Sequence, residues 1–190
     1  MANGLLLVIS GPSGSGKTTI ARAVEERMGA SFSVSATTRP PSDSEQRGRD
    51  YEFLSEDDFQ ELVDRGAFLE HAKVYGRHRY GTLRDQVDGQ LAEGRVVILD
   101  IDVQGAVQVR QSMPEALLVF ILPPSDDVLE QRLRDRGRDD EPSIQRRLAE
   151  ARKEIEVGVH SGVYDAQIIN DDLDLAVEET CRLARARWVR

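Results

Sequence analysis

The chain has 190 residues, 39% of them hydrophobic and 31% charged, and its 34 acidic against 25 basic residues give a net charge of −9. This length suits one domain with its own core, no apolar run approaches the ~20 residues that cross a bilayer, and the acidic balance argues against nucleic-acid binding through a general basic surface. The N-terminal Met-Ala-Asn-Gly lacks the basic region of a secretory signal, and the single cysteine, Cys181, suits a reducing compartment. We therefore expect a cytoplasmic protein with no membrane or nucleic-acid partner.

The chain begins with a predicted strand over residues 4–10, a glycine-rich loop and a predicted helix over 17–28. The loop reads GPSGSGKT and fits the pattern G-x-x-x-x-G-K-[ST] of loops that hold a polyphosphate. Its main-chain N–H groups and the positive end of the helix converge on the phosphates, Lys17 reaches the outer phosphates, and the Thr18 hydroxyl holds Mg²⁺. The strand before the loop and the helix after it disfavour the alternative, a flexible Gly/Ser loop. The predicted phosphate-binding residues are Gly11, Ser13, Gly14, Ser15, Gly16, Lys17, Thr18 and Thr19.

The next segment is predicted to hold short elements with abundant turn chemistry. Short strand pieces and a polar loop from Pro40 to Asp50 come first. Ser55 is a candidate N-cap, with Asp58 three residues later, for a helix that closes at Arg65-Gly66. The segment ends with a strand through Phe68–Val74, a tight turn and a helix near 83–93.

Three short, continuous apolar runs mark further strands, since uninterrupted apolar residues are typical of strands buried on both faces of a parallel sheet. The runs are Val96–Leu99, Leu117–Leu122 and Ile168–Ile169, and the helices predicted beside them cover 126–136, 143–158 and 172–188. This β–α alternation predicts an α/β fold, a doubly wound parallel sheet that binds ligands beyond the carboxyl ends of its strands. Gly11, Asp100 and Asn170 all fall at such ends.

Two acidic residues, Asp100 and Asp102, follow the first of these apolar runs. An acidic residue at the end of a buried strand, in a chain with a phosphate loop, is placed to hold Mg²⁺ directly or through water. Asp100 is therefore the predicted metal ligand, together with Thr18. For Asp102 the alternative is a cap on the helix that follows, and the residues by themselves leave that choice open.

Nine segments, in order and close to the family spacing, resemble those of the guanylate kinases. They are GPSGSGKTT (11–19), SVSATTRPP (33–41), DYEF (50–53), FLEHA (68–72), YGT (80–82), LDIDVQG (99–105), RLRDRG (132–137), RRL (146–148) and IINDD (168–172). The resemblance runs from Leu5 to about Ala184. It implies transfer of the γ-phosphoryl group of ATP to GMP, giving ADP and GDP in purine nucleotide metabolism, with Mg²⁺ as cofactor.

The resemblance also implies an architecture, a P-loop NTPase core with a parallel five-stranded sheet, an inserted GMP-binding segment and a helical lid. The chain would be one domain over 1–190. Its parts would be the core (1–34, 96–125 and 159–190), the GMP-binding segment (35–95) and the lid (126–158).

Catalytic roles fall by resemblance on Lys17 in the phosphate loop and on three lid arginines, Arg132, Arg136 and Arg147. Phosphoryl transfer needs positioning and stabilisation of charge on the transferred group, which arginines and Mg²⁺ supply. Arg132 and Arg136 are four residues apart, so they share one face of a helix. By spacing alone these arginines would be ordinary solvated helix charges, and we keep that interpretation for Arg134 and Arg138.

The hydrogen-bonding groups of guanine define what an acceptor site requires. Its N1–H and N2 amine donate, so carboxylates should face them, while a hydroxyl or main-chain N–H faces O6; adenine would leave the carboxylates unpaired. By resemblance the carboxylates are Glu70 and Asp102, and the hydroxyls are Ser35 and Thr82. Also by resemblance, Arg39, Tyr51 and Tyr80 bind the GMP phosphate, and Asn170 contacts the adenine of ATP. The alternatives are plain packing for the two tyrosines and a simple turn for Asn170.

The chain departs from the family pattern in two places. Family members carry a second arginine three residues after Arg39, where this chain has Ser42. We expect Arg47 or Arg49, in the same polar loop, to supply the missing phosphate contact. The turn 76–81 is one residue longer than usual and adds two basic residues near the acceptor phosphate.

Two other functions fit parts of the sequence. A phosphoribosyl kinase would share the P-loop core but would have no use for the base-reading set of Glu70, Asp102 and Ser35. A non-catalytic guanylate-kinase-like module that binds phosphorylated peptides would have lost Lys17 and the lid arginines. We therefore expect an active enzyme that uses ATP and GMP, with dGMP as a second acceptor, and the sequence leaves an oligomer open.

Overall fold

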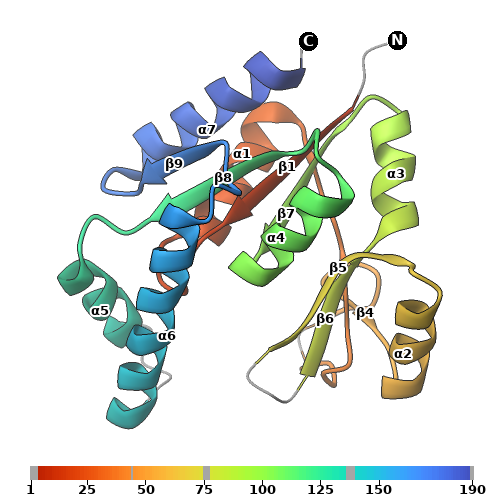
Figure 1. The fold of residues 1–190 in the computed structure, drawn as a ribbon, viewed down its shortest axis with the longest axis horizontal. Helices are drawn as coiled ribbons and strands as arrows, with labels where there is room; N and C mark the ends of the chain where they lie inside the picture. Colours follow the sequence, from red (N-terminus) through yellow and green to blue (C-terminus); the bar gives the residue numbers. More distant parts are fainter. Residues whose placement is uncertain (1–3, 44, 75–77, 136–139, 189–190) are drawn as a thin grey trace.

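The structure, a computed structural model, describes residues 4–43, 45–74, 78–135 and 140–188, which form a mixed α/β architecture with two sheets (Figure 1). The larger sheet contains β1 (Leu5–Ser10), β2 (Ser31–Phe32), β7 (Val96–Ile101), β8 (Leu117–Leu122) and β9 (Ala166–Ile169). The smaller sheet contains β3 (Ser35–Thr37), β4 (Glu52–Phe53), β5 (Phe68–Val74) and β6 (His78–Leu83). The helices are α1 (Lys17–Met28), α2 (Glu56–Asp64), α3 (Arg84–Ala92), α4 (Val103–Ser112), α5 (Asp126–Asp135), α6 (Glu141–His160) and α7 (Leu173–Trp188).

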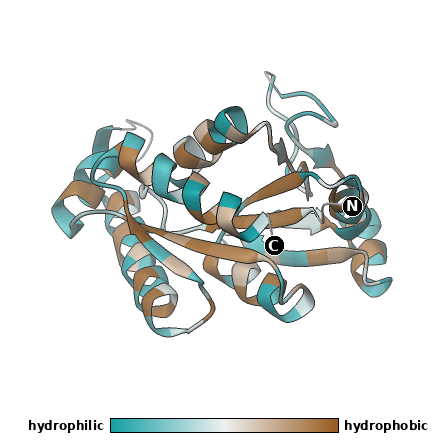
Figure 2. Cartoon of the chain, turned by 90° about the horizontal axis from the view of Figure 1, so that it is seen from above, coloured by the Kyte–Doolittle hydropathy of each residue, from teal (hydrophilic) through white to brown (hydrophobic). Residues whose placement is uncertain are grey.

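The larger sheet has the strand order β2-β7-β1-β8-β9 with parallel pairings throughout, which confirms the parallel five-stranded sheet expected from the sequence. Its strands are continuously apolar because helices cover both faces. In β1, Leu5, Leu7 and Ile9 face the layer of α1 and α7, while Leu6 and Val8 face the layer of α3 and α4. Hydrophobic residues accordingly follow these strands through the middle of the molecule (Figure 2).

The smaller sheet, in the order β4-β3-β6-β5, lies beside the larger one and carries α2 (Figure 1). Its apolar cluster joins Ala36, Phe59 and Phe68, and the rings of Phe59 and Phe68 stack with their centroids 4.5 Å apart. The predicted N-cap of α2 is confirmed, since the Ser55 hydroxyl accepts a hydrogen bond from the main-chain N–H of Asp58 at 3.0 Å. This sheet therefore has a small core of its own.

Strand β6 lies where the sequence predicted a tight turn. It pairs antiparallel with β5, and Thr82 lies opposite Glu70. Its sequence, HRYGTL, has no apolar run because one face meets the cavity described below and the other meets α2. On that second face the Arg79 guanidinium lies 4.5 Å from the Phe59 ring centroid and donates to the Gln60 side chain at 2.8 Å. Arg79 therefore packs against α2, while Arg77, the other basic residue of the longer turn, lies outside the described residues.

Helices α5 and α6 form a hairpin that projects beyond the carboxyl end of β8 (Figure 1). The hairpin has its own apolar cluster of Leu129, Leu133, Ile144, Leu148 and Ala151. Helix α6 begins two residues earlier than predicted because Asp140 caps it, accepting a hydrogen bond from the Ser143 N–H at 3.1 Å. Within the described ranges, none of the helices is long and apolar enough to span a bilayer.

The contact between α6 and the larger sheet generates a stability prediction. Gly158 is buried, and a Cβ there would come within 2.2 Å of the Phe120 ring in β8. We expect Gly158→Ala to lower the free energy of unfolding by about 1–3 kcal/mol through overpacking, as measured by urea denaturation. The matched control is Gly89 in α3, which has no described neighbour within 4 Å of its Cβ position. Gly89→Ala should raise the free energy of unfolding by about 0.5–1 kcal/mol, and equal effects of the two substitutions would contradict this account.

Candidate active site

A cavity of about 590 Å³ opens at the carboxyl edge of the larger sheet, where the smaller sheet and α6 also meet it. Its lining includes Gly11, Ser13 and Lys17 of the phosphate loop, Asp100 and Asp102 at the end of β7, Ser35, Tyr51, Glu70 and Tyr80 from the smaller sheet and its adjoining loop, and Arg147 and Glu154 of α6. All of these except Glu154 are among the residues that the sequence singled out. The other predicted residues that the structure describes are not part of this lining: Gly14, Ser15, Gly16, Thr18, Thr19, Arg39, Thr82, Arg132 and Asn170. Arg136, like Arg138, lies outside the described residues.

The backbone of the phosphate loop adopts conformations and close contacts that require glycine. Gly16 caps α1 with a φ of 91°, in the left-handed region that favours glycine. A Cβ at Gly11 would come within 2.4 Å of the Ile121 carbonyl oxygen in β8, so the loop lies directly on the sheet. The Ile20 N–H donates to the Gly16 carbonyl oxygen at 3.1 Å, whereas the N–H groups that precede it at a helix start have no intrahelical acceptor, and such groups bind anions.

Asn170 and Arg132 hold the phosphate loop through its carbonyl groups. Asn170 follows β9, is 5% exposed, and donates through Nδ2 to the Ser15 carbonyl oxygen at 2.7 Å. Arg132 donates through Nη1 to the same carbonyl at 3.4 Å and through Nη2 to the Asn170 carbonyl at 3.0 Å. Gly16 leaves the room for this contact, since a Cβ there would lie 2.3 Å from Nδ2 of Asn170. The sequence did not indicate this positioning role of Asn170, whose contact with adenine stays a prediction.

The side chains of Thr18 and Asp100 contact each other where the phosphate loop leads into α1. The Thr18 hydroxyl donates a hydrogen bond to Oδ2 of Asp100. The other oxygen, Oδ1, is buried and has no hydrogen-bond partner among the described residues. Those residues also contain no group of three or more His, Cys, Asp or Glu side chains that could hold a metal by itself. The donor set fits Mg²⁺, which nucleotide sites bind through one or two carboxylates together with substrate phosphates and waters.

Glu70 is a buried carboxylate facing the cavity from β5. It is 5% exposed and accepts a hydrogen bond from the Thr82 hydroxyl at 2.7 Å. Burial raises the pKa of Glu70 to about 7, and the charge of Asp102 contributes in the same direction. Gly105 lets this carboxylate approach α4, because a Cβ there would lie 2.8 Å from Oε2 of Glu70. The sequence contained this glycine in LDIDVQG without indicating its role.

Asp102 is the helix cap that the sequence left open as an alternative, and its role in binding a substrate stays a prediction. Its Oδ1 accepts a hydrogen bond from the Gly105 N–H at 2.8 Å and so caps α4. The same residue lines the cavity together with Glu70. Capping fixes the Asp102 side chain at the first turn of α4, which keeps two carboxylates at this part of the cavity.

Arg39, Tyr51 and Tyr80 form one cluster at the far end of the cavity. Arg39 donates through Nε to the Tyr80 hydroxyl at 3.3 Å, and its guanidinium carbon lies 5.4 Å from the Tyr51 ring centroid. The two tyrosine rings meet edge to face with centroids 5.9 Å apart. Tyr51 and Tyr80 line the cavity, whereas Arg39 is not part of its lining and contacts both tyrosines.

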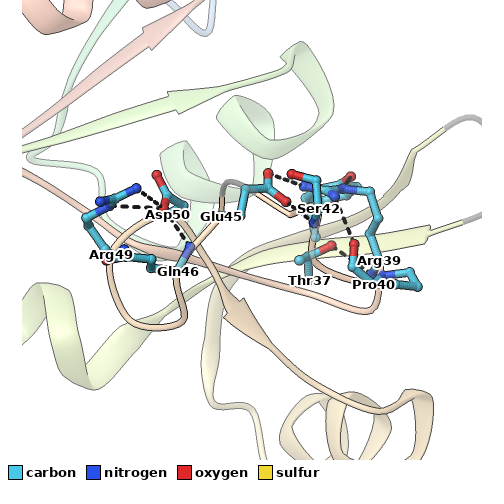
Figure 3. A network of polar contacts seen from close by, with 9 residues as sticks. Thr37, Arg39, Pro40, Ser42, Glu45, Gln46, Arg49 and Asp50 are labelled. Carbon is cyan, nitrogen blue, oxygen red and sulfur yellow. Dashed lines mark hydrogen bonds and ion pairs between the residues drawn. The ribbon is translucent and has the colours of Figure 1, made fainter.

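The two arginines expected to replace a missing phosphate contact have other partners. Arg47 donates to the carbonyl oxygen of Phe53. Arg49 pairs with Asp50 at 2.8 Å, on the left of Figure 3. Neither arginine belongs to the described lining of the cavity, so a contact with the phosphate would require this loop to rearrange.

Helix α6 contributes four charged residues to the cavity lining, Arg147, Glu150, Lys153 and Glu154. Arg147 and Glu154 are seven positions apart and therefore lie on one helix face. Burial raises the pKa of Glu154, whereas Lys17 and the Ser13 N–H lower it, so this carboxylate lies beside the phosphate loop. The sequence missed Glu154 because it stands among many solvated helix charges. Arg134, in contrast, pairs with glutamates of the hairpin itself, as expected for a solvated charge.

Comparison with known proteins gives a consistent set of similarities. The family model described as Guanylate kinase matches residues 3–186. The chain is 47% identical to the guanylate kinase of Neisseria gonorrhoeae (97% of this chain, 91% of that protein) and 45% identical to that of Escherichia coli K12 (100% and 91%). Among solved structures it is similar to a guanylate kinase from Anaplasma phagocytophilum, with a TM-score of 0.78 and 32% identity over 100% of this chain and 88% of that one. A gluconokinase from Sinorhizobium meliloti, with a TM-score of 0.50 and 20% identity over 97% and 95% of the two chains, is similar in fold only.

The buried Glu70 generates a pH-dependent stability prediction. Because the pKa of Glu70 is about 7 in the folded state, above the ordinary value of 4.5, the folded chain binds more protons than the unfolded chain between these pH values. This contribution to the free energy of unfolding therefore falls as pH rises through that window. Glu70→Gln removes the effect, so its stability relative to the parent should rise by roughly 3 kcal/mol between pH 4 and pH 8.

Urea denaturation at a series of pH values measures this difference. Glu61→Gln, on the exposed side of α2, is the control and should show a flat difference over the same range. A flat difference for Glu70→Gln would contradict the assignment of Glu70 as a buried carboxyl with a raised pKa.

Proposed function

The chain belongs to the guanylate kinase family and transfers the γ-phosphoryl group of ATP to GMP, and on this basis we propose how its residues hold the two substrates. One observation carries the proposal. A phosphate loop and a pair of carboxylates, the buried Glu70 and the half-buried Asp102, face the same cavity. Donor and acceptor can then be held side by side, with the reacting groups oriented for direct transfer.

On the donor side, the loop from Gly11 to Thr19 binds the ATP phosphates through its main-chain N–H groups, and Lys17 meets the phosphates nearest the acceptor. Thr18 and Asp100 hold Mg²⁺, which is supported by their hydrogen bond and by the buried Oδ1 of Asp100, unpartnered among the described residues. When bound, Mg²⁺ neutralises charge on the phosphoryl oxygens during transfer. Asn170 contacts the adenine while its amide holds the loop.

On the acceptor side, Glu70 and Asp102 accept hydrogen bonds from the N1–H and the N2 amine of guanine. The Thr82 hydroxyl donates to Glu70 and so orients this carboxylate, while the Ser35 hydroxyl, which lines the cavity, donates to O6. AMP would present an acceptor at N1 and leave buried carboxylate oxygens unpaired, which disfavours it strongly. The GMP phosphate lies in the cluster of Arg39, Tyr51 and Tyr80.

The hairpin of α5 and α6, residues 126–158, is the lid. Arg132, Arg136 and Arg147 stabilise charge on the phosphoryl group in transfer. The hairpin has a separate apolar cluster, so it can move as a unit over the substrates and exclude water that would otherwise hydrolyse ATP. On closure Arg132 exchanges its present main-chain partners for phosphate oxygens.

The two alternative functions fit the site less well. A phosphoribosyl acceptor would leave the buried Glu70 and the neighbouring Asp102 without a partner of matching chemistry. A phosphopeptide-binding module would have no need for Lys17 in an intact loop or for a Thr18–Asp100 pair suited to a metal.

The proposal extends to dGMP and to the cellular compartment. None of the contacts assigned above is to the ribose 2′-hydroxyl, so dGMP should bind as a second acceptor. Cys181 is buried and free, which is compatible with the reducing cytoplasm in which we place the reaction.

Acceptor choice tests the base-reading pair. We expect Glu70→Gln or Asp102→Asn to lower kcat/KM for GMP by about 10²–10⁴-fold, because the lost charge faces donors of guanine, while KM for ATP stays unchanged. The measurement is a coupled assay of ADP release with GMP, AMP, dTMP and ribose phosphates. Glu61→Gln is the control. Parent activity that is as high with AMP or a ribose phosphate as with GMP would refute the assignment.

Magnesium dependence tests the metal site. Asp100→Asn removes a charged oxygen beside the Thr18 hydroxyl, so the Mg²⁺ concentration for half-maximal activity should rise on the order of 10-fold or more. Titration of activity with Mg²⁺ at saturating nucleotides measures this concentration. Asp102→Asn, on the acceptor side, should leave it unchanged. Equal Mg²⁺ requirements in the two variants would rule out Asp100 as the ligand.

A further inference from the structure

The carboxylate of Glu45 holds the arginine that we assign to the GMP phosphate (Figure 3). Oε1 of Glu45 accepts a hydrogen bond from Nη2 of Arg39 at 2.6 Å, and Oε2 accepts one from the main-chain N–H of Ser42 at 2.8 Å. The Glu45 N–H in turn donates to the Ser42 carbonyl oxygen at 3.0 Å. Both carboxylate oxygens therefore serve to close a short loop onto Arg39.

The Arg39 guanidinium is held at each of its nitrogens. Besides the bond to Glu45, Nη1 donates to the Pro40 carbonyl oxygen at 2.9 Å and Nε donates to the Tyr80 hydroxyl at 3.3 Å. The ring of Tyr51 lies alongside, 5.4 Å from the guanidinium carbon. An arginine carries more N–H groups than these bonds use, so the group is fixed in place and can still bind an anion.

The ion pair persists over the whole working pH range. Hydrogen bonds from Arg39 and then from Ser42 lower the pKa of Glu45 to about 2. The carboxylate is therefore already ionised where a phosphate monoester takes up its second negative charge, at about pH 6, and charge-assisted bonds of this kind are stronger than neutral ones.

We propose that Glu45 is a positioning residue for GMP, which fixes the Arg39 guanidinium before the phosphate arrives. The inference deepens the proposed function, because it rests on the assignment of Arg39 to the acceptor phosphate. Position 42 carries serine where the family has a second arginine, and Arg47 and Arg49 contact other groups. With fewer arginines available, ordering Arg39 in advance removes an entropic cost from binding.

Kinetics of Glu45→Gln, with GMP varied at saturating ATP, test the proposal. The amide keeps the size of the side chain and removes its charge, so KM for GMP should rise on the order of 10-fold. We expect kcat and KM for ATP to stay within about twofold, since Arg39 contacts the acceptor only. Glu45→Asp keeps the charge at shorter reach and should give an intermediate KM. Glu61→Gln removes the Glu61–Arg65 ion pair of α2 and should change nothing.

A double-mutant cycle with Arg39→Ala identifies the route of the effect. Because Glu45 acts through Arg39, Glu45→Gln should add no further increase in KM for GMP in the Arg39→Ala background. Additive increases would overturn the proposal and indicate a general role in loop stability. Thermal unfolding of each variant should give melting temperatures close to that of the parent.

Three other kinetic results would each overturn the proposal. A decrease in KM for GMP in Glu45→Gln would overturn the proposal by showing that the carboxylate competes with the phosphate. An unchanged KM, beside an increase for Arg39→Ala, would overturn the role of Glu45 while leaving the acceptor site intact. No increase for Arg39→Ala would overturn the assignment of Arg39, and with it the role of Glu45.

Discussion

Hydrogen bonding between the parallel strands β1 and β7 sets Ile9 opposite Asp100, and pairing of β1 with β8 sets Ser10 opposite Phe120. Because these strands run in the same direction, their carboxyl ends meet at one edge, where the phosphate loop begins directly after β1. The hydrogen bond from Thr18 to Asp100 depends on this register, since a shift by one residue would turn each side chain to the opposite face of the sheet. Apolar contacts on both faces hold the register, and the donor site follows from it.

The chain has a net charge of −9 and acts on anionic substrates, and side chains of both charges line its cavity. The basic residues of the lining are Lys17, Lys73, Arg147 and Lys153, and Arg39 contacts two of the lining tyrosines. Carboxylates line the same cavity, and among them Glu70 is buried with a raised pKa. Its burial lowers the stability of the empty protein at neutral pH, and in the proposed acceptor site the same burial would favour ligands with matching donors. Stability and selectivity thus oppose each other at one residue.

The smaller sheet and the helical hairpin each have an apolar cluster separate from those of the larger sheet. The smaller sheet is tied to α4 by Gln108, whose side chain exchanges two hydrogen bonds with the main chain of His71 at 2.9 and 3.1 Å. The hairpin meets the larger sheet through Gly158 and Phe120. Units with separate cores can shift relative to one another while staying folded, which is what enclosure of two substrates requires. The cavity lies where these units meet.

The sequence predicts the phosphate loop, the buried strands and the cap of α2, because short-range patterns of glycines, apolar runs and capping side chains specify them. It also indicated Glu70 and Asp102, through resemblance, as the base-reading pair. Other features were visible only in the tertiary structure. They are the strand β6, the hydrogen bond from Asn170 to the Ser15 carbonyl across 155 positions, and the location of Glu154 beside the phosphate loop. The ion pair between Arg39 and Glu45 was likewise visible only in the tertiary structure. Such features depend on which surfaces pack together after folding. Polar or isolated residues show no hydrophobic periodicity, so the sequence pattern does not predict their contacts.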